Sequence, residues 1–252
     1  TAELRVDVGP VIDAEAQTSI VQHIERFKAQ GHRVYQHPSH LAARSTPGTF
    51  VPPTLIELNH IGELQREVFG PVLHLVRYAR KDLDQLLDQI NATGYGLTQG
   101  VHTRIDETIA RVVDRAHAGN VYVNRNMVGA VVGVQPFGGE GLSGTGPKAG
   151  GPLYLLRLLS RRPADALART FADADRATPP EDAVRERLLA PLATLQQWAQ
   201  LQGNAALVST CQRFARQTQS GTARTLHGPT GERNVYTLAP RARVLCLAHS
   251  VD

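Results

Sequence analysis

Apolar residues recur every three to four positions in several parts of the chain, which is the spacing of one face of a helix. In residues 13–30 this stripe follows Asp13, a residue type that caps helix N-termini, and Gly31 marks its end. Pro191 is expected to kink or restart one of the later helices. The same spacing predicts further helices over residues 82–91, beginning at Asp82, and over 106–118, beginning at Asp106, as well as over 182–201 and 204–216.

Short runs rich in β-branched residues alternate with these helices. They predict strands at "HRVYQ" (32–36), "TLIEL" (54–58), "PVLHLVRY" (71–78), "GLTQGVHT" (96–103) and "NVYVN" (120–124). Strands that alternate with helices through short connections predict an α/β fold with a largely parallel sheet. The apolar run "YLLRLLS", residues 154–160, has no decisive period, so helix and strand both stay open.

The character of the chain changes after Arg161. Residues 163–181 carry alanine, aspartate and three prolines, which is typical of a linker. Residues 182–252 contain the last two predicted helices, then a turn at "GPTGERN" and an apolar strand at "RVLCLA". Because a lone terminal strand needs partners, we expect a second domain that is partial, helical and then β.

Length and composition indicate a globular protein: 252 residues, of which 42% are hydrophobic and 20% charged. No apolar run approaches the roughly 18–20 residues of a membrane span, and no secretory leader opens the chain. The chain does not begin with Met, so a processed product, an isolated domain and a fragment all stay open. The net charge is +4, but the arginines are scattered and only 5% of residues are aromatic, which makes a nucleic-acid binder the least favoured class.

The cysteines and histidines indicate neither a disulfide framework nor a metal site. Cys211 lies in a helical pattern and Cys246 in an apolar run, which predicts buried thiols in a reducing compartment. His37 and His40 raise the question of a metal ligand pair. Pro38 lies between them and no other ligand type is near, so a surface loop is favoured and no metal is predicted.

Glycine is concentrated in residues 129–151, which contain nine of them. Gly139, Gly141 and Gly144 form a literal G-x-G-x-x-G, but a dinucleotide-binding loop must follow a strand and open a helix. Pro147 and the glycines after it argue against such a helix. Dense glycine also lets the backbone approach a ligand, and exposed amides can hold a carboxylate. The interleaved valines favour a packed loop over a free one.

Four motifs resemble one family. "REVFGPVLHLVRY", "NATGYGLTQGVHT", "GNVYVNR" and "PFGGEGLSGTG" occur in this order and near this spacing in the C-terminal half of aldehyde dehydrogenases, which residues 1–162 resemble. "VGAVVGVQPFGGEGLSGTGPKAGGPLYLLR" is closer still to the L-glutamate γ-semialdehyde (Δ1-pyrroline-5-carboxylate) dehydrogenases within bacterial bifunctional proline-catabolic enzymes. "GPTGERNVYTLAPRARVLCLA" is similar to a segment that follows in the same enzymes. The resemblance implies a mostly parallel sheet with flanking helices and NAD-dependent oxidation of this semialdehyde to L-glutamate.

The resemblance assigns five site residues. Glu67 matches the glutamate that binds the nicotinamide ribose hydroxyls, and Phe69 matches the aromatic that packs near the nicotinamide. Gly129 and Ala130 match the loop whose amides hold the substrate's α-carboxylate, and Phe137 matches an aromatic on its aliphatic chain. Without the resemblance, a surface charge at Glu67 and a core residue at Phe69 would be favoured.

The resemblance also implies what the chain lacks. The family's nucleophilic cysteine lies in a "GQxCS"-like stretch upstream of the matched region, with the oxyanion asparagine, the base glutamate and the Rossmann domain. Neither cysteine of this chain has that context, so we expect no catalytic residue here and no activity of the chain alone. The cofactor is NAD, while FAD is expected only in an upstream proline dehydrogenase domain. The expected partners are a carboxylate-bearing small molecule, the upstream half of the polypeptide and further copies in a homo-oligomer.

Several alternatives stay open. The same fold could act on another aldehyde, or the chain could be a non-catalytic assembly module, since residues 154–160 lie where such enzymes often make subunit contacts. Lys148 lies close to the glycine-rich loop, but without a motif match a solvent-exposed lysine is favoured. The expected location is the bacterial cytoplasm, with peripheral membrane association of the parent enzyme left open.

Overall fold

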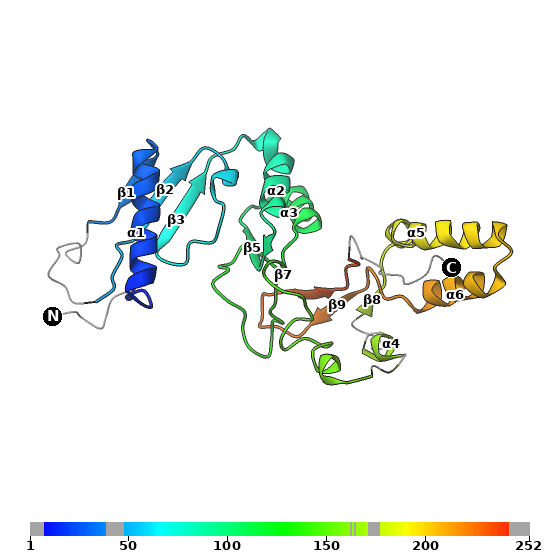
Figure 1. The fold of residues 1–252 in the computed structure, drawn as a ribbon. Coiled ribbons are helices and arrows are strands. Elements are labelled where there is room, and N and C mark those ends of the chain that lie inside the picture. Colours follow the sequence, from blue (N-terminus) through cyan, green and yellow to red (C-terminus); the bar gives the residue numbers. More distant parts are fainter. Residues whose placement is uncertain (1–7, 39–47, 162, 164, 171–176, 242–252) are drawn as a thin grey trace. The chain divides into compact units, whose positions relative to one another are not determined.

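The structure is a computed structural model that describes residues 8–38, 48–161, 163, 165–170 and 177–241 (Figure 1). The chain divides into two compact units: unit 1 comprises Thr1–Gly96 with Thr103–His117, and unit 2 comprises Leu97–His102 with Ala118–Asp252. Among the helices of the described residues, none is both long and apolar enough to cross a membrane.

The described part of unit 1 combines three α-helices with a small sheet. Its elements are α1 (Ala14–Ala29), β1 (Arg33–Gln36), β2 (Thr54–Leu58), the 3-10 helix η2 (Ile61–Glu63), β3 (Val72–Val76), the 3-10 helix η3 (Arg80–Asp82), α2 (Leu83–Ala92), β4 (Tyr95–Gly96) and α3 (Asp106–Arg115). The sheet order is β1-β2-β3, with β1 antiparallel to β2 and β2 parallel to β3. The expected α/β character is confirmed, while the antiparallel β1 departs from a purely parallel sheet.

Helix α1 supplies one side of the core of unit 1. Asp13 caps it as predicted, because its carboxylate accepts a 2.8 Å hydrogen bond from the Ala16 amide. Ile24 and Phe27 are each 2% exposed and pack with the fully buried Ile56 of β2. Burial of each such side chain contributes about 1.5–3 kcal/mol. Val21, placed on the same stripe by its spacing, is 43% exposed, so the buried face is narrower than predicted.

Two histidines also meet at the interface between α1 and the sheet. His23 is only 5% exposed, and its Nε2 lies 2.9 Å from Nε2 of His74 on β3. An Arg26 guanidinium nitrogen lies 3.2 Å from Nδ1 of His23. Burial is the main cause that lowers the pKa of His23 to about 4, and the positive charges of Arg26 and Arg66, and of His74 when it is protonated, act in the same direction. Burial also lowers the pKa of His74. Both imidazoles are therefore neutral in the folded protein near pH 7.

Acid is expected to destabilise unit 1 before the carboxylates titrate. As pH falls from 6.5 towards 4, unfolded His23 binds a proton that folded His23 does not, so the free energy of unfolding decreases. A shift of this size corresponds to about 3 kcal/mol across that window. Urea unfolding of β2 and β3, followed by hydrogen-exchange mass spectrometry at pH 7 and pH 5, measures it. His23→Gln should flatten the pH dependence of the free energy of unfolding. His117→Gln, at an exposed histidine of the same unit, is the control and should not. Equal pH dependence of both variants and the wild type would refute the role of His23 in acid destabilisation.

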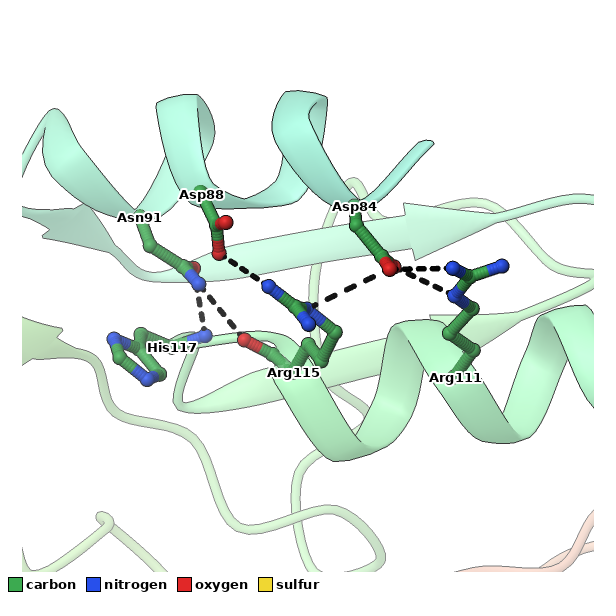
Figure 2. A network of polar contacts seen from close by, with 6 residues as sticks. All are labelled: Asp84, Asp88, Asn91, Arg111, Arg115 and His117. Atoms are coloured by element: carbon green, nitrogen blue, oxygen red, sulfur yellow. Dashed lines mark hydrogen bonds and ion pairs between the residues drawn. The ribbon is translucent and has the colours of Figure 1, made fainter. Parts of the chain in front are cut away.

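Helices α2 and α3 lie against each other through a polar network (Figure 2). Asp84 accepts two hydrogen bonds from the Arg111 guanidinium, one of 2.6 Å to Nε, and this bidentate contact lowers the pKa of the Asp84 carboxyl. Asn91 donates to the Arg115 carbonyl at 2.8 Å and accepts from the His117 amide at 3.0 Å. Because these bonds satisfy backbone groups where α3 ends, Asn91 holds the backbone in place at the point where the chain leaves unit 1.

Two of the predicted helix caps differ from the structure. Asp82 occupies the N-cap position of α2, but its side chain makes no capping hydrogen bond, because η3 leads directly into the helix. Asp106 is the first helical residue of α3, and Ile105 is the N-cap. There Thr103 accepts from the Ile105 amide at 3.2 Å. Asp106 still lies in the first turn, where its charge suits the helix dipole.

Two small sheets and a helical hairpin form most of what the structure describes of unit 2. Its elements are β5 (Thr98–Val101), β6 (Asn120–Val123), β7 (Glu140–Gly141), the 3-10 helix η4 (Leu155–Leu158), α4 (Ala166–Thr170), β8 (Ala177–Thr178), α5 (Asp182–Leu201), α6 (Ala205–Gln217), β9 (Ala223–Leu226) and β10 (Asn234–Thr237). Strands β5 and β6 are parallel, while β8, β9 and β10 form an antiparallel sheet. The open question about "YLLRLLS" is therefore answered by a helix, of the 3-10 type.

The C-terminal part of unit 2 refines several predictions. Helix α5 continues through Pro191 without restarting. Cys211 is 1% exposed in α6, which confirms a buried thiol. Segment 163–181, expected to be a linker, contains α4 and β8. His37 lies on the surface, as predicted. The predictions for His40, Cys246 and the strand "RVLCLA" fall outside the described residues.

Candidate functional site

The first group of predicted site residues lies in the loop between η2 and β3 of unit 1. Val68 is half-buried and packs against the core, whereas Glu67 and Phe69 on either side of it are exposed. Phe69 is 86% exposed, so the alternative of a core residue is wrong. Gly70 fixes the loop on α1, because a Cβ there would lie 2.4 Å from Ile20 Cδ1. The loop thus exposes both a carboxylate and an aromatic ring to the solvent.

These two side chains fit the chemistry of a nicotinamide nucleotide. Within the described part of the chain, the Glu67 carboxylate makes no hydrogen bond or ion pair. Its two oxygens can therefore accept hydrogen bonds from two vicinal hydroxyls. The Phe69 ring offers an apolar face to a flat heterocycle.

The second group lies in the loop that leaves β6 in unit 2. Gly129 and Ala130 are half-buried, and neither amide donates a hydrogen bond to any residue that the structure describes. The amides on both sides are occupied: Val128 N–H lies 3.4 Å from Asn126 Oδ1, and Val131 N–H donates to Gln135 Oε1 at 3.0 Å. Two adjacent donors therefore remain for a ligand, and a carboxylate has two acceptor oxygens to match them.

Phe137, at the far end of this loop, is held by its backbone. It exchanges hydrogen bonds of 3.0 and 2.9 Å with Ala149. Asn120 on β6 donates to the Pro136 carbonyl at 2.8 Å and accepts from the Gly138 amide at 3.2 Å. These contacts leave the half-buried Phe137 ring on a rigid backbone, which suits an apolar contact with a ligand.

Lys148 is not the solvent-exposed lysine that we predicted. It is half-buried, and its ammonium donates to the carbonyls of Gly138, at 2.9 Å, and of Gly119. Burial lowers the pKa of Lys148, and the charge of Glu140 acts in the opposite direction. The ammonium therefore holds two backbone segments together, and two of its three N–H donors serve this role.

The G-x-G-x-x-G begins just before β7, with Gly139, and continues through this strand into the turn that ends at Gly144. The Ser143 amide donates to the Glu140 carbonyl at 3.0 Å, and Gly141 has a φ of 58°. No helix begins between Gly144 and Leu155, a stretch that the structure describes throughout. The prediction that no helix follows these glycines is confirmed, so this stretch lacks the helix N-terminus that receives the pyrophosphate in a dinucleotide-binding loop.

Sequence reasoning missed the residues that support the loop, above all Asn120, Gln135 and Lys148. Gln135 is 9% exposed and is the only polar side chain in the run "VGAVVGVQPFGG". A lone amide among apolar residues was the one local signal of a buried hydrogen-bonding group. In the residues that the structure describes, no cluster of histidine, cysteine, aspartate or glutamate could hold a metal.

Comparison with known proteins places the fold in a family. Residues 2–162 match the aldehyde dehydrogenase family, and the chain belongs to it. It is 62% identical over 248 residues to the bifunctional protein PutA of Klebsiella aerogenes, which covers 97% of this chain and 19% of that protein. The identity to 1-pyrroline-5-carboxylate dehydrogenase 2 of Bacillus subtilis is 41% over 152 residues, covering 60% of this chain and 28% of the relative. The chain spans about a fifth of the length of the PutA relatives.

Solved structures agree with this family. A structure of Bradyrhizobium japonicum proline utilization A has a TM-score of 0.54 at 55% identity, covering 58% of this chain and 14% of that chain. A 1-pyrroline-5-carboxylate dehydrogenase from Thermus, solved with bound NAD, has a TM-score of 0.50 at 38% identity, covering 57% and 27%. The recognition of the aldehyde dehydrogenase fold and of its proline-catabolic branch from the motifs is thereby confirmed.

Proposed function

We propose that this chain is part of an NAD-dependent dehydrogenase that oxidises L-glutamate γ-semialdehyde to L-glutamate in proline catabolism. The observation that carries the proposal is the pair of amides at Gly129 and Ala130, which donate to none of the described residues, between two neighbours whose amides do donate. This substrate carries an α-carboxylate that two adjacent donors can bind. Similarity to PutA and to 1-pyrroline-5-carboxylate dehydrogenases supports the same substrate class.

Different residues of the chain bind the cofactor and the substrate. Glu67 accepts hydrogen bonds from the ribose hydroxyls of NAD, and Phe69 packs beside its nicotinamide ring. Gly129 and Ala130 orient the aldehyde by its distant carboxylate, and Phe137 packs on the aliphatic part between the two ends. NAD, when bound, supplies the acceptor for the hydride that leaves the substrate carbon. Orientation of this kind contributes to catalysis because the reacting groups meet without a further loss of freedom.

The nucleophile belongs to another part of a longer polypeptide. Cys211 is 1% exposed within α6, so its thiol cannot meet a substrate. We assign the catalytic cysteine, the base and an FAD-binding proline dehydrogenase domain to the upstream part of that polypeptide, in the bacterial cytoplasm. The division of the chain at residue 162, where the family match ends, is part of the same proposal.

Self-association is a further part of the proposal. Leu155 and Leu158 of η4 are 73% and 75% exposed, and the N-cap residue Tyr154 is 42% exposed. Exposed apolar side chains gathered in this way are typical of contact surfaces. Gel filtration of the longer polypeptide, with and without Leu155→Glu, tests this. A smaller assembly is expected in the variant, and an unchanged elution volume would count against η4 as a contact.

Assays of NADH formation test the proposed function. The longer polypeptide should form NADH from NAD+ and L-glutamate γ-semialdehyde, whereas the purified 252-residue chain should form none. Steady NADH formation by the short chain would overturn the assignment of the nucleophile to another segment. Failure of the longer polypeptide with this aldehyde would overturn the substrate.

A further inference from the structure

A turn far beyond the family match contacts the loop of Gly129 and Ala130. Glu232 lies between β9 and β10, where its amide donates to the Pro229 carbonyl at 3.1 Å and closes the turn. One carboxylate oxygen of Glu232 accepts a 3.1 Å hydrogen bond from Gln135 Nε2. The other oxygen lies 3.4 Å from the Arg125 guanidinium. One side chain therefore joins the beginning and the end of the loop.

Gln135 carries this contact to the site itself. Its Oε1 accepts from the amide of Val131, the residue directly after Ala130, at 3.0 Å. A backbone N–H can only donate and a carboxylate can only accept. The Gln135 oxygen must therefore face the Val131 amide, and its NH2 group must face Glu232. The side chain is buried, and its Nε2 has a second, longer contact of 3.4 Å to Asn234 Oδ1. Loss of Glu232 would therefore replace the 3.1 Å bond to a charged acceptor by this weaker contact to a neutral one.

The contact with Gln135 outweighs the contact with Arg125. The side chains of Arg125 and Glu232 are 24% and 33% exposed, and ion pairs accessible to solvent contribute little. Arg125 also has a second partner, because its guanidinium carbon lies 4.9 Å from the centre of the Tyr122 ring. The Gln135 amide is buried against a charged acceptor, and hydrogen bonds of that type are the stronger ones.

We infer that Glu232, acting through Gln135, is a positioning residue for the loop whose amides receive the substrate carboxylate. The inference rests on the proposed function of Gly129 and Ala130. Glu232 does not touch the substrate; it holds Gln135 so that the Val131 amide stays occupied and the two preceding amides keep their place. A segment outside the family match is thereby part of the support of the site.

Kinetics of the longer polypeptide test the inference. Gln135→Ala and Glu232→Ala should each raise KM for L-glutamate γ-semialdehyde by about tenfold, the effect of one lost hydrogen bond to a charged group. KM for NAD+ should stay at the wild-type value. A general loss of stability would instead lower the apparent kcat and leave both KM values unchanged, because it only reduces the amount of folded enzyme. Glu232→Gln keeps one acceptor for Gln135 and should have a smaller effect. The double variant should resemble Gln135→Ala alone, because both residues act in one chain of contacts.

Glu186→Ala is the matched control, since it removes an exposed carboxylate of α5 that has no partner among the described residues. It should leave both KM values unchanged. Equal changes in the KM for aldehyde and for NAD+ in Glu232→Ala, or fully additive effects in the double variant, would overturn the inference.

Hydrogen exchange gives a readout that needs no activity. Exchange of the Val131 amide should be faster in Gln135→Ala and in Glu232→Ala than in wild type or Glu186→Ala. Unchanged exchange in both variants overturns the inference by itself. The two proposals can also fail separately. If the wild-type polypeptide oxidises no aldehyde while exchange is still faster in the variants, the proposed function is overturned but the contact between Glu232 and Gln135 is supported.

Discussion

Replacement of Glu67 by glutamine is expected to lower kcat/KM for NAD+ by about 10- to 100-fold in the longer polypeptide. A carboxylate offers an acceptor oxygen to each of two vicinal ribose hydroxyls, whereas a glutamine amide offers one oxygen and places an NH2 group against the second hydroxyl. Loss of a hydrogen bond to a charged acceptor costs about 1.5–3 kcal/mol. The KM for the aldehyde should stay near that of the wild type, because Glu67 serves the cofactor.

Steady-state kinetics with varied NAD+ measure this effect. Glu107→Gln is a suitable control, since Glu107 is an exposed acid of α3 in the same unit and receives the same change of charge. The loop around Glu67 should keep its fold, because Val68 and Gly70 hold it on the core. An unchanged KM and kcat for NAD+ in Glu67→Gln would count against the assigned role.

Gly119→Ala is expected to displace the backbone next to Phe137 and so to disrupt the candidate substrate site. A Cβ at Gly119 would lie 1.8 Å from the Gly138 carbonyl oxygen and 2.8 Å from Lys148 Nζ. Because the closest atom belongs to the backbone, no side-chain rotation can relieve the clash. Overpacking of this kind typically costs about 1–3 kcal/mol, and a backbone clash of this depth belongs at the upper end. The segment that carries Phe137 must move, so aldehyde oxidation should fall together with stability.

Urea unfolding and hydrogen exchange of the Phe137 and Ala149 amides report this change. Gly9→Ala is the control, since a Cβ at Gly9 meets nothing within 4 Å and its φ is not positive. Wild-type stability and wild-type exchange in Gly119→Ala would show that the loop is not packed against Gly119 in solution.

Local patterns predicted the elements of the fold well where the responsible forces are local. The N-cap of α1 follows from Asp13 and an apolar stripe, and both are read along the chain. The antiparallel pairing of β1 with β2 does not follow in this way, because register depends on which edge a strand meets in space. The wrong cap at Asp106 was an error of one residue, the usual uncertainty at helix ends.

The candidate site shows the same difference between what local sequence predicts and what depends on contacts between distant residues. Motifs selected Glu67, Phe69, Gly129, Ala130 and Phe137 one at a time, and the structure leaves the first two exposed on one loop. The supporting contacts join residues far apart in sequence. Lys148 donates to the carbonyl of Gly119, 29 positions earlier, and Gln135 donates to Glu232, 97 positions later, so composition and spacing could not predict either contact.

Selection of the aldehyde by its carboxylate is the central claim, and one ratio tests it most directly. We would measure kcat/KM of the longer polypeptide with NAD+ for L-glutamate γ-semialdehyde and for butanal, which lacks the carboxylate. Two hydrogen bonds to a charged group from the Gly129 and Ala130 amides predict a preference of about 100-fold or more for the semialdehyde. Equal values of kcat/KM for the two aldehydes would contradict the claim.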